Sequence, residues 1–350
     1  MRKIFNILLI TTLVLTACGS SAGKFFSKKT PHEKYADKHE ETPEGRAWLA
    51  AGKQSLEYPV EIELPYRQQG YFQPGKPRAL SLEFSAKAGE RISFDLDKKI
   101  TTGQVMYIDL FRKGSLSDNP LYSAAPGDST FVFDVEDKGE YILRVQPEIG
   151  YHAKYELNIS SGASLAFPVA GNKAKTGSFW GASRDGGKRS HEGIDIFAPK
   201  RTPVIASADG YVTGVHEGGL GGKVVWQRVS GKNITLYYAH LDKQMVSEGQ
   251  SVQKGDTIGL VGNTGNAKHT PSHLHFGIYS FSGPIDPFPF VNPTVKKAPL
   301  LAKKELSNEL KLEKTLKLSN GTALTANTRL IPLAVNAKGY IAELPDGNMM

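Results

Sequence analysis

The segment HTPSHLHFGIY, residues 269–279, contains two histidines one residue apart, His273 and His275. On a helix the two imidazoles would point about 200° apart, whereas alternate residues of a strand face the same side. The aromatic and β-branched residues that follow them favour a strand. Both rings are therefore expected to lie on the same face of the sheet and to point into one site. They would act there as two metal ligands, or as one metal ligand beside a proton-transfer group. Two surface histidines that lie together by chance are the alternative.

Two other short segments carry residues of the same kinds. SHEGIDIF contains His191 and Asp195 with Gly193 between them, and YYAHLD contains His240 after two tyrosines. Each segment is a weak signal by itself, because such short patterns are frequent. Taken together with the histidine strand, and in this order along the chain, they form a specific pattern.

The pattern resembles the lysostaphin-like zinc endopeptidases, also called LytM-type peptidases, which cut peptide bridges in peptidoglycan. The resemblance covers residues 165–292. It extends to the glycine-rich frames around the motifs, HEGIDIFAPKRTPVIASADGYV, YYAHLDKQMVSEGQSVQKGDTIGLVGNTG and PSHLHFGIY. Some relatives have lost ligands and act as scaffolds, but no metal or catalytic position of the family pattern is missing here. The resemblance therefore implies a peptidoglycan-degrading metalloendopeptidase whose substrate is the stem peptides of the wall.

The resemblance also implies the role of each residue. His191, Asp195 and His275 correspond to the ligands of a zinc ion (Zn²⁺), which takes three protein ligands and keeps one open position in catalytic sites. Zinc bound there would polarise the scissile carbonyl and acidify a water molecule. His240 and His273 correspond to the catalytic pair, for proton transfer and oxyanion stabilisation. The sequence does not distinguish the role of one from that of the other.

Several neighbouring residues receive no such role. His216 and His269 lie outside the family pattern and are interpreted as bystanders. Glu192 follows His191, but it does not lie in a His-Glu-x-x-His helix, so we do not predict a general base there. Trp180 either lines the cleft or packs in the core. Of Tyr237 and Tyr238, which alternate on their strand, one is expected to line the groove and the other to pack in the core.

The N-terminus, MRKIFNILLITTLVLTACGSSAG, has two positive charges and then an apolar stretch too short to span a membrane. It ends in LTAC and resembles a bacterial lipobox, so residues 1–17 are predicted to be a lipoprotein signal peptide. Cys18, the only cysteine, is then the lipid-attachment residue, and an intramolecular disulfide is impossible. This predicts a protein of the bacterial cell envelope, held to a lipid bilayer through an acylated cysteine.

The remaining chain is predicted to be all-β. Residues 18–54 are polar and are expected to form a tether with a short helix at 46–53, in which His32 and His39 are solvated. Residues 55–160 alternate with period two between turn signals, which predicts a β-sandwich similar to pre-peptidase domains. Residues 165–292 form a Gly-rich antiparallel β domain, and 293–350 a Lys-rich linker with part of a small β-barrel.

The composition and the motifs also bear on other functional classes. The net charge of +8 is compatible with an anionic wall polymer or membrane, but no basic groove with interleaved aromatics indicates nucleic acid. A LytM-type scaffold that binds the wall and activates another hydrolase is the main alternative, together with an unknown regulatory partner. A lipoyl-type carrier would need a modifiable lysine at a hairpin tip, which is not evident, and would leave the histidine strand unexplained. A metal-storage lipoprotein would not need His240 or His273.

Overall fold

The computed structural model describes residues 29–349, apart from 74, 100–104, 116–118, 151–152, 295–297, 303–305, 307–308, 319–320, 322 and 346. The predicted signal peptide and Cys18 lie outside the described residues. No helix of the described residues is long and apolar enough to cross a membrane.

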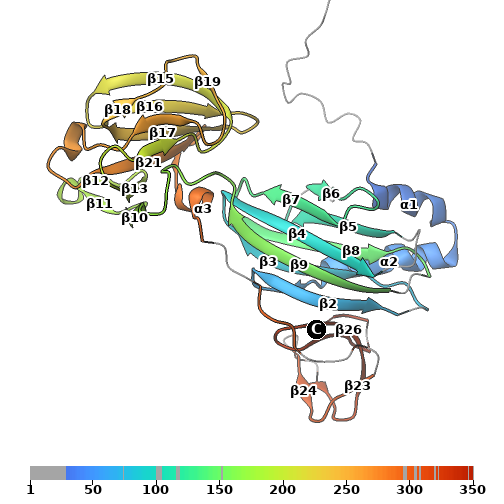
Figure 1. Ribbon diagram of the computed structural model, residues 1–350. Coiled ribbons are helices and arrows are strands. Elements are labelled where there is room, and N and C mark those ends of the chain that lie inside the picture. The colour runs from blue at the N-terminus through green and yellow to red at the C-terminus, as the bar shows by residue number, and fades with distance from the viewer. Residues whose placement is uncertain are drawn as a thin grey trace, which may run out of the picture.

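A β-sandwich forms the first body of the molecule (Figure 1). One layer has the order β1-β3-β8-β5-β6, with bounds Val60–Glu61, Leu80–Ala86, Gly139–Pro147, Met106–Arg112 and Tyr122–Ser123. The other has the order β23-β26-β2-β9-β4-β7, with bounds Leu310–Lys311, Arg329–Asn336, Tyr66–Phe72, Ala153–Ala163, Glu90–Lys99 and Thr130–Asp134; β27, Tyr340–Glu343, pairs with β26. The inward side chains of both layers, among them Phe84, Phe94 and Leu143, share one core. These two packed layers are compatible with the sandwich that the alternating sequence pattern predicts.

The end of the chain belongs to this sandwich, which the sequence did not predict. Strand β26 pairs with β2, with Gln69 opposite Val335. Ala334 and Ile341 lie in the common core. The short hairpin of β24, Leu316–Lys317, and β25, Ala323–Leu324, lies beyond it. The Gly-rich domain is consequently inserted between two parts of one sandwich.

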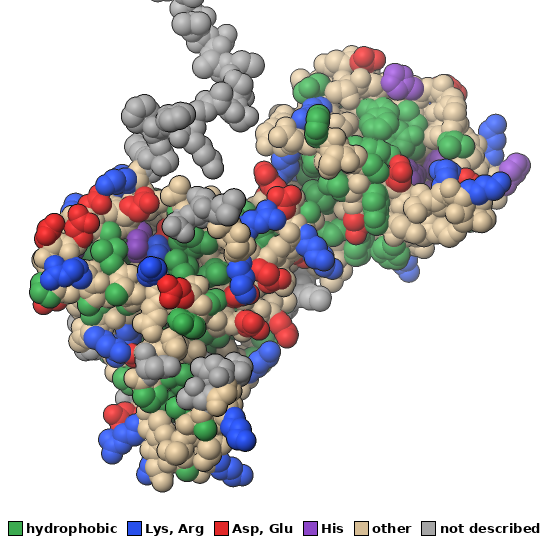
Figure 2. Space-filling view, turned by 180° about the vertical axis from the view of Figure 1, so that it is seen from behind, with side chains coloured by type: hydrophobic (Ala, Val, Ile, Leu, Met, Phe, Trp, Pro, Cys, Tyr) green, Lys and Arg blue, Asp and Glu red, His purple; other side chains and the backbone are tan. Residues whose placement is uncertain are grey.

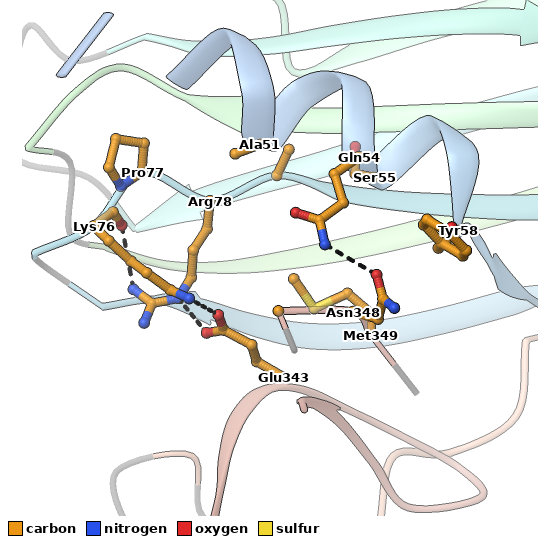
Figure 3. Close-up of a pocket in the computed structure, with 12 residues that line it drawn as sticks. Ala51, Gln54, Ser55, Tyr58, Lys76, Pro77, Arg78, Glu343, Asn348 and Met349 are labelled. Carbon is orange, nitrogen blue, oxygen red and sulfur yellow. Dashed lines mark hydrogen bonds and ion pairs between the residues drawn. The ribbon is translucent and has the colours of Figure 1, made fainter. Parts of the chain in front are cut away.

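Figure 3 shows how the C-terminal residues are held against α2 and the 76–79 loop. The buried carboxylate of Glu343 accepts a hydrogen bond from Arg78 Nε at 2.7 Å and also pairs with Lys76. Gln54 donates to Asn348 Oδ1 at 3.0 Å. A small cavity of about 50 Å³ lies among these side chains. Polar contacts thus add to the strand pairing that fixes the end of the chain.

Two helices precede the sandwich, α1 (Pro31–His39) and α2 (Pro43–Glu57). Each begins with a proline after a threonine N-cap, which is a favourable helix start. They pack on the sandwich through Trp48, which is 1% exposed, and His32, which is 6% exposed. The expectation that His32 is solvated was therefore wrong. Its Nε2 lies 2.8 Å from Gln146 Oε1, and its ring stacks on Trp48.

The Gly-rich domain is built on one mainly antiparallel sheet. Its order is β10-β13-β21-β17-β16-β15-β19, with bounds Lys175–Ser178, Ile194–Phe197, His273–Ser280, Ile234–Leu241, Gly222–Val229, Gly210–Gly218 and Ser251–Val252; β22, Gly283–Ile285, pairs with β21. Smaller pieces are β14 (Pro203–Ile205), β20 (Thr257–Leu260) and β18 (Lys243–Gln244), the pair β11 (Ser183–Arg184) and β12 (Arg189–Ser190), and the 3-10 turns Asp185–Gly187 and Gly265–Ala267. The predicted all-β class is confirmed.

The short helix α3, Phe288–Val291, joins the two bodies (Figure 1). Phe290 packs so closely over Gly89 of the sandwich that a Cβ there would lie 2.2 Å from the ring. Lys232 of the Gly-rich domain pairs with Asp134 of the sandwich at 2.8 Å. Figure 2 shows the two bodies from behind as separate lobes that meet over a limited area.

Candidate active site

The two histidines of the opening motif lie on β21, as predicted, with their side chains on one face of the sheet. His275 is paired with Asp195 of β13 on one side and with Ala239 of β17 on the other. The register therefore places the second and third motifs beside the first. His191 precedes β13, and its backbone N–H donates to Ala182 O at 2.9 Å.

Three side chains converge at this point of the sheet. His191 Nε2, His275 Nδ1 and Asp195 Oδ1 form a triangle in which each edge is 3.0 Å. These are the three residues that the family resemblance implies as ligands, and their donor atoms all lie within 4.8 Å of one another. His191 and Asp195 are buried and His275 is half-buried, so one side of the triangle is open.

The donor set fits a divalent cation. His191 Nδ1 donates to Phe179 O at 2.9 Å, so in the neutral ring Nε2 carries a lone pair. That lone pair faces a carboxylate oxygen, and two acceptors at this distance need a positive charge between them. In a tetrahedral zinc site with bonds of about 2.0–2.1 Å, the ligand atoms lie roughly 3.3 Å apart. The observed triangle is close to this size.

Asp195 is held from both sides. Burial opposes its negative charge, but interactions with the His191 and His275 imidazoles outweigh burial and hold the pKa of Asp195 well below its usual range. Arg184 donates to its second oxygen, Oδ2, at 2.8 Å, and to Ser178 Oγ at 2.6 Å. Arg184 was not predicted from the sequence, because its contact with Asp195 arises from folding of the β11–β12 hairpin and has no signature in spacing.

His240 owes its orientation to an irregularity in β17. Its φ is +62°, which is uncommon for a residue with a side chain. The register between β16 and β17 shifts here, so a bulge turns the imidazole toward the site. Its Nδ1 donates to Thr264 O at 2.9 Å. Burial, with the charges of His273 and His275, lowers the pKa of His240 to about 4.

His273 completes the constellation. Its Nδ1 donates to Pro271 O at 2.8 Å, which leaves Nε2 as the acceptor of the neutral ring. The centroid of its ring lies 5.0 Å from that of His240, and the His240 ring lies 5.9 Å from that of His275. The structure thus brings together all five site residues of the Gly-rich domain, with two imidazoles beside the open side of the triangle.

Glycine is needed beside the triangle. A Cβ on Gly193 would lie 2.6 Å from Cε1 of His275 and 2.7 Å from Phe276 O. Any larger residue would displace the His275 ring, which explains a glycine between His191 and Asp195.

The remaining residues singled out in the sequence are divided between surface and core. His216 and His269 are exposed, Trp180 is half-buried, and Tyr238 is fully buried. Tyr237 lies on the face of His275, with ring centroids 5.9 Å apart. Tyr238 therefore packs in the core, as predicted for one of the two tyrosines, and Tyr237 lies beside the site.

Comparison with known proteins identifies the part of the chain that contains this site. Residues 189–287 match the family described as Peptidase family M23. The DD-carboxypeptidase/endopeptidase Mpg of Neisseria meningitidis serogroup B is 36% identical over 149 residues, 42% of this chain and 31% of the relative. The L-Ala--D-Glu endopeptidase of Bacillus subtilis is 37% identical over 132 residues, 32% of this chain and 38% of the relative.

The chain therefore spans only about a third of the length of these curated relatives. Among solved structures, the catalytic domain of lysostaphin from Staphylococcus simulans is 31% identical, with a TM-score of 0.31, and covers 33% of this chain and 90% of its own. The family match, residues 189–287, lies within the Gly-rich domain that the motifs indicated.

Proposed function

Because the chain contains a LytM-type domain of peptidase family M23, we propose that it is a zinc metalloendopeptidase that hydrolyses peptide cross-links of peptidoglycan. The observation that carries this proposal is the 3.0 Å triangle of His191, Asp195 and His275 with two further imidazoles beside its open side. The relatives named above are endopeptidases of peptide bonds, which supports the same reaction class.

His191, Asp195 and His275 would hold the zinc ion. Two neutral imidazoles and one carboxylate leave a net charge near +1, so bound zinc would polarise the scissile carbonyl and lower the pKa of a water molecule. Arg184 would orient Asp195 through Oδ2, as residues behind metal ligands commonly do.

His240 and His273 would provide proton transfer and oxyanion stabilisation. Each donates from Nδ1 to a backbone carbonyl, so each presents Nε2 to the site. A neutral imidazole can take a proton from the attacking water, and the resulting imidazolium can donate it to the leaving amine. The low pKa of His240, about 4, keeps its ring neutral at physiological pH, so its Nε2 has a lone pair toward the site. His273 would donate a hydrogen bond to the developing oxyanion in its imidazolium form, in which Nε2 as well as Nδ1 carries a proton.

Attachment to a membrane through Cys18 is the second part of the proposal. The lipobox-like sequence before this cysteine supports it. A single acyl chain binds a membrane only marginally, so stable attachment needs more than one chain on this residue. Metabolic labelling with a fatty-acid analogue should label the full chain, and the Cys18→Ser variant should remain unlabelled.

Digestion of purified peptidoglycan tests the activity. The protein lacking residues 1–18 should release cut muropeptides, a zinc chelator should abolish the release, and added zinc should restore it. His240→Ala should lose roughly 10²–10⁴-fold in rate while its zinc content stays unchanged. An inactive wild type that contains zinc, together with a His240→Ala variant that still restores cell lysis, would favour the scaffold instead.

A further inference from the structure

A tight turn, residues 179–182, holds His191 in place. Ala182 N–H donates to Phe179 O at 3.3 Å, and Gly181, the third residue, has a φ of +76° that glycine adopts readily. Three hydrogen bonds join the turn to His191. Its ring donates from Nδ1 to Phe179 O, its backbone N–H donates to Ala182 O, and its carbonyl accepts from Gly181 N–H, each at 2.9 Å. The turn therefore sets both the backbone and the ring orientation of His191.

His191 depends on this turn more than the other two expected metal ligands do. Asp195 and His275 lie opposite each other on the paired strands β13 and β21, so the sheet register fixes their positions. His191 lies between β12 and β13 and belongs to neither strand. A displacement of the turn would therefore move His191 relative to Asp195 and His275, and would change the size of the triangle of donor atoms.

The turn contacts α3 through the side chain of Phe179. The Phe179 ring lies edge-on to the ring of Phe288, with centroids 5.1 Å apart and an interplanar angle of 85°. Edge-to-face packing is a favourable arrangement of two aromatic rings. Phe179 is 47% exposed, so few other side chains can hold it, whereas Phe288 is half-buried against the core of the Gly-rich domain. Phe288 thus supports the turn from the side of α3.

Helix α3 is in turn fixed on the sandwich. Phe290, which is 6% exposed, packs over Gly89, and its carbonyl accepts from Leu165 N–H at 2.8 Å. Gly89 O accepts hydrogen bonds from Ser164 N–H at 3.1 Å and from Ser164 Oγ at 2.7 Å. Because Phe288 and Phe290 share the short helix α3, a shift of this helix on the sandwich would move both rings.

We propose that Phe288, acting through Phe179, is a positioning residue for His191 and couples metal binding to the packing of α3 on the sandwich. Contacts join the sandwich to α3, α3 to the turn and the turn to His191, but coupling requires that a change at one end alters the other. A contact that favours the metal-binding position of His191 must itself be favoured when the metal binds. The inference rests on the proposed zinc site, and it gives the sandwich a role in setting the zinc affinity.

Zinc affinity of the purified full chain tests the positioning role. Phe288→Ala removes the supporting ring, and we expect the affinity to fall about tenfold, whereas Phe288→Tyr keeps the ring and should bind as the wild type does. Phe179→Ala changes an exposed side chain and should show the same loss, even if Phe288→Ala does not fold. Phe281→Ala, which removes an exposed phenylalanine of the same domain, is the control. Wild-type affinity in Phe179→Ala would overturn the inference.

Proton exchange in the metal-free protein separates this inference from the proposed function. The imidazole N–H signal of His191, identified by its absence in His191→Ala, is followed by NMR in protein with ¹⁵N-labelled histidine. The Nδ1 proton should exchange with water about tenfold faster in Phe179→Ala than in the wild type, because its hydrogen bond to Phe179 O opens more often. Equal exchange rates would contradict the positioning role whether or not zinc binds. A wild type that takes up no zinc, with the difference in exchange intact, would contradict the proposed zinc site alone.

Spin labels on the two bodies test the coupling. Added zinc should narrow the distribution of distances between the labels in the wild type and in Phe288→Tyr, and should leave it unchanged in Phe288→Ala. A wild-type distribution that does not respond to bound zinc would show that the metal site and the packing of α3 are independent.

Discussion

At the scale of single residues, the site depends on side chains whose positions are set by their neighbours. His240 adopts a positive φ within a bulge, and both free imidazoles are fixed by backbone carbonyls. Such strained backbone positions cluster at functional sites because the surrounding structure compensates for their cost. Asp195 is likewise fixed by Arg184, which makes Arg184 a positioning residue.

Replacing Arg184 should therefore weaken metal binding. Arg184→Gln leaves Asp195 Oδ2 without its cation, and we expect zinc affinity to fall roughly 10–100-fold. Competition with a chromogenic chelator measures the affinity. Arg189→Gln, which removes a nearby exposed arginine paired with Asp185, should bind zinc as the wild type does. Equal affinity in the two variants would show that Arg184 does not support the site.

His32 should make stability depend on pH. Burial, and next the charge of Arg144, lowers its pKa to about 4 from 6.5. Above pH 6.5 the ring is neutral in the folded and the unfolded states. As the pH falls toward 4, the unfolded state takes up the proton first, so the free energy of unfolding should drop by up to about 3 kcal/mol.

Urea unfolding followed by tryptophan fluorescence at pH 7 and pH 4.5 measures this drop. His32→Gln should show a smaller drop than the wild type because the titrating group is absent. The exposed His216→Gln is the control and should behave as the wild type does. Parallel drops in all three proteins would contradict the assignment to His32.

At the scale of elements, the sequence predicts the strand that carries the two histidines, but it does not predict the pairing of β26 with β2. Strand β21 was predictable because alternate residues of a strand share a face, so His273 and His275 had to lie together. The pairing of β26 with β2 was not, because its partner strand lies more than 250 residues earlier. The sequence predicts a tether with only a short helix where α1 and α2 lie, because the segment is polar and charged.

The last strand should be sensitive to its buried ion pair. Glu343→Ala leaves the Arg78 guanidinium, which is 8% exposed, without its carboxylate, and we expect a loss of about 3–5 kcal/mol. Glu309→Ala breaks a comparable pair with Arg329 at the surface and should cost less than about 1 kcal/mol. Urea midpoints of the two variants measure the difference, and equal midpoints would contradict this account of how the C-terminus is held.

At the scale of the whole molecule, the insertion of the Gly-rich domain gives it two covalent connections to the sandwich. The contact between Lys232 and Asp134 lies near the start of β17, whereas His240 lies near its end. The strand from Ile234 to His240 alone spans about 20 Å. This contact of the sandwich is thus remote from the site, and we expect it to fix orientation without covering the cleft.

The contact of Gly89 with Phe290 should control that orientation. Gly89→Ala places a methyl group against the ring and strains a backbone whose φ is +90°. Gly127→Ala strains a similar backbone, with a φ of +97°, but meets no atom within 4 Å, so it is the matched control. Distances between spin labels on the two bodies should broaden in Gly89→Ala and not in Gly127→Ala. Identical distributions would show that this packing does not hold the bodies together.

The zinc content of the purified full chain tests the central claim most directly. After incubation with zinc and removal of the excess, elemental analysis should find one zinc per wild-type chain and none in His275→Ala. His216→Ala, an exposed histidine of the same domain, should retain one. A folded wild-type protein that takes up no zinc, or a His275→Ala variant that holds as much as the wild type, would contradict the account.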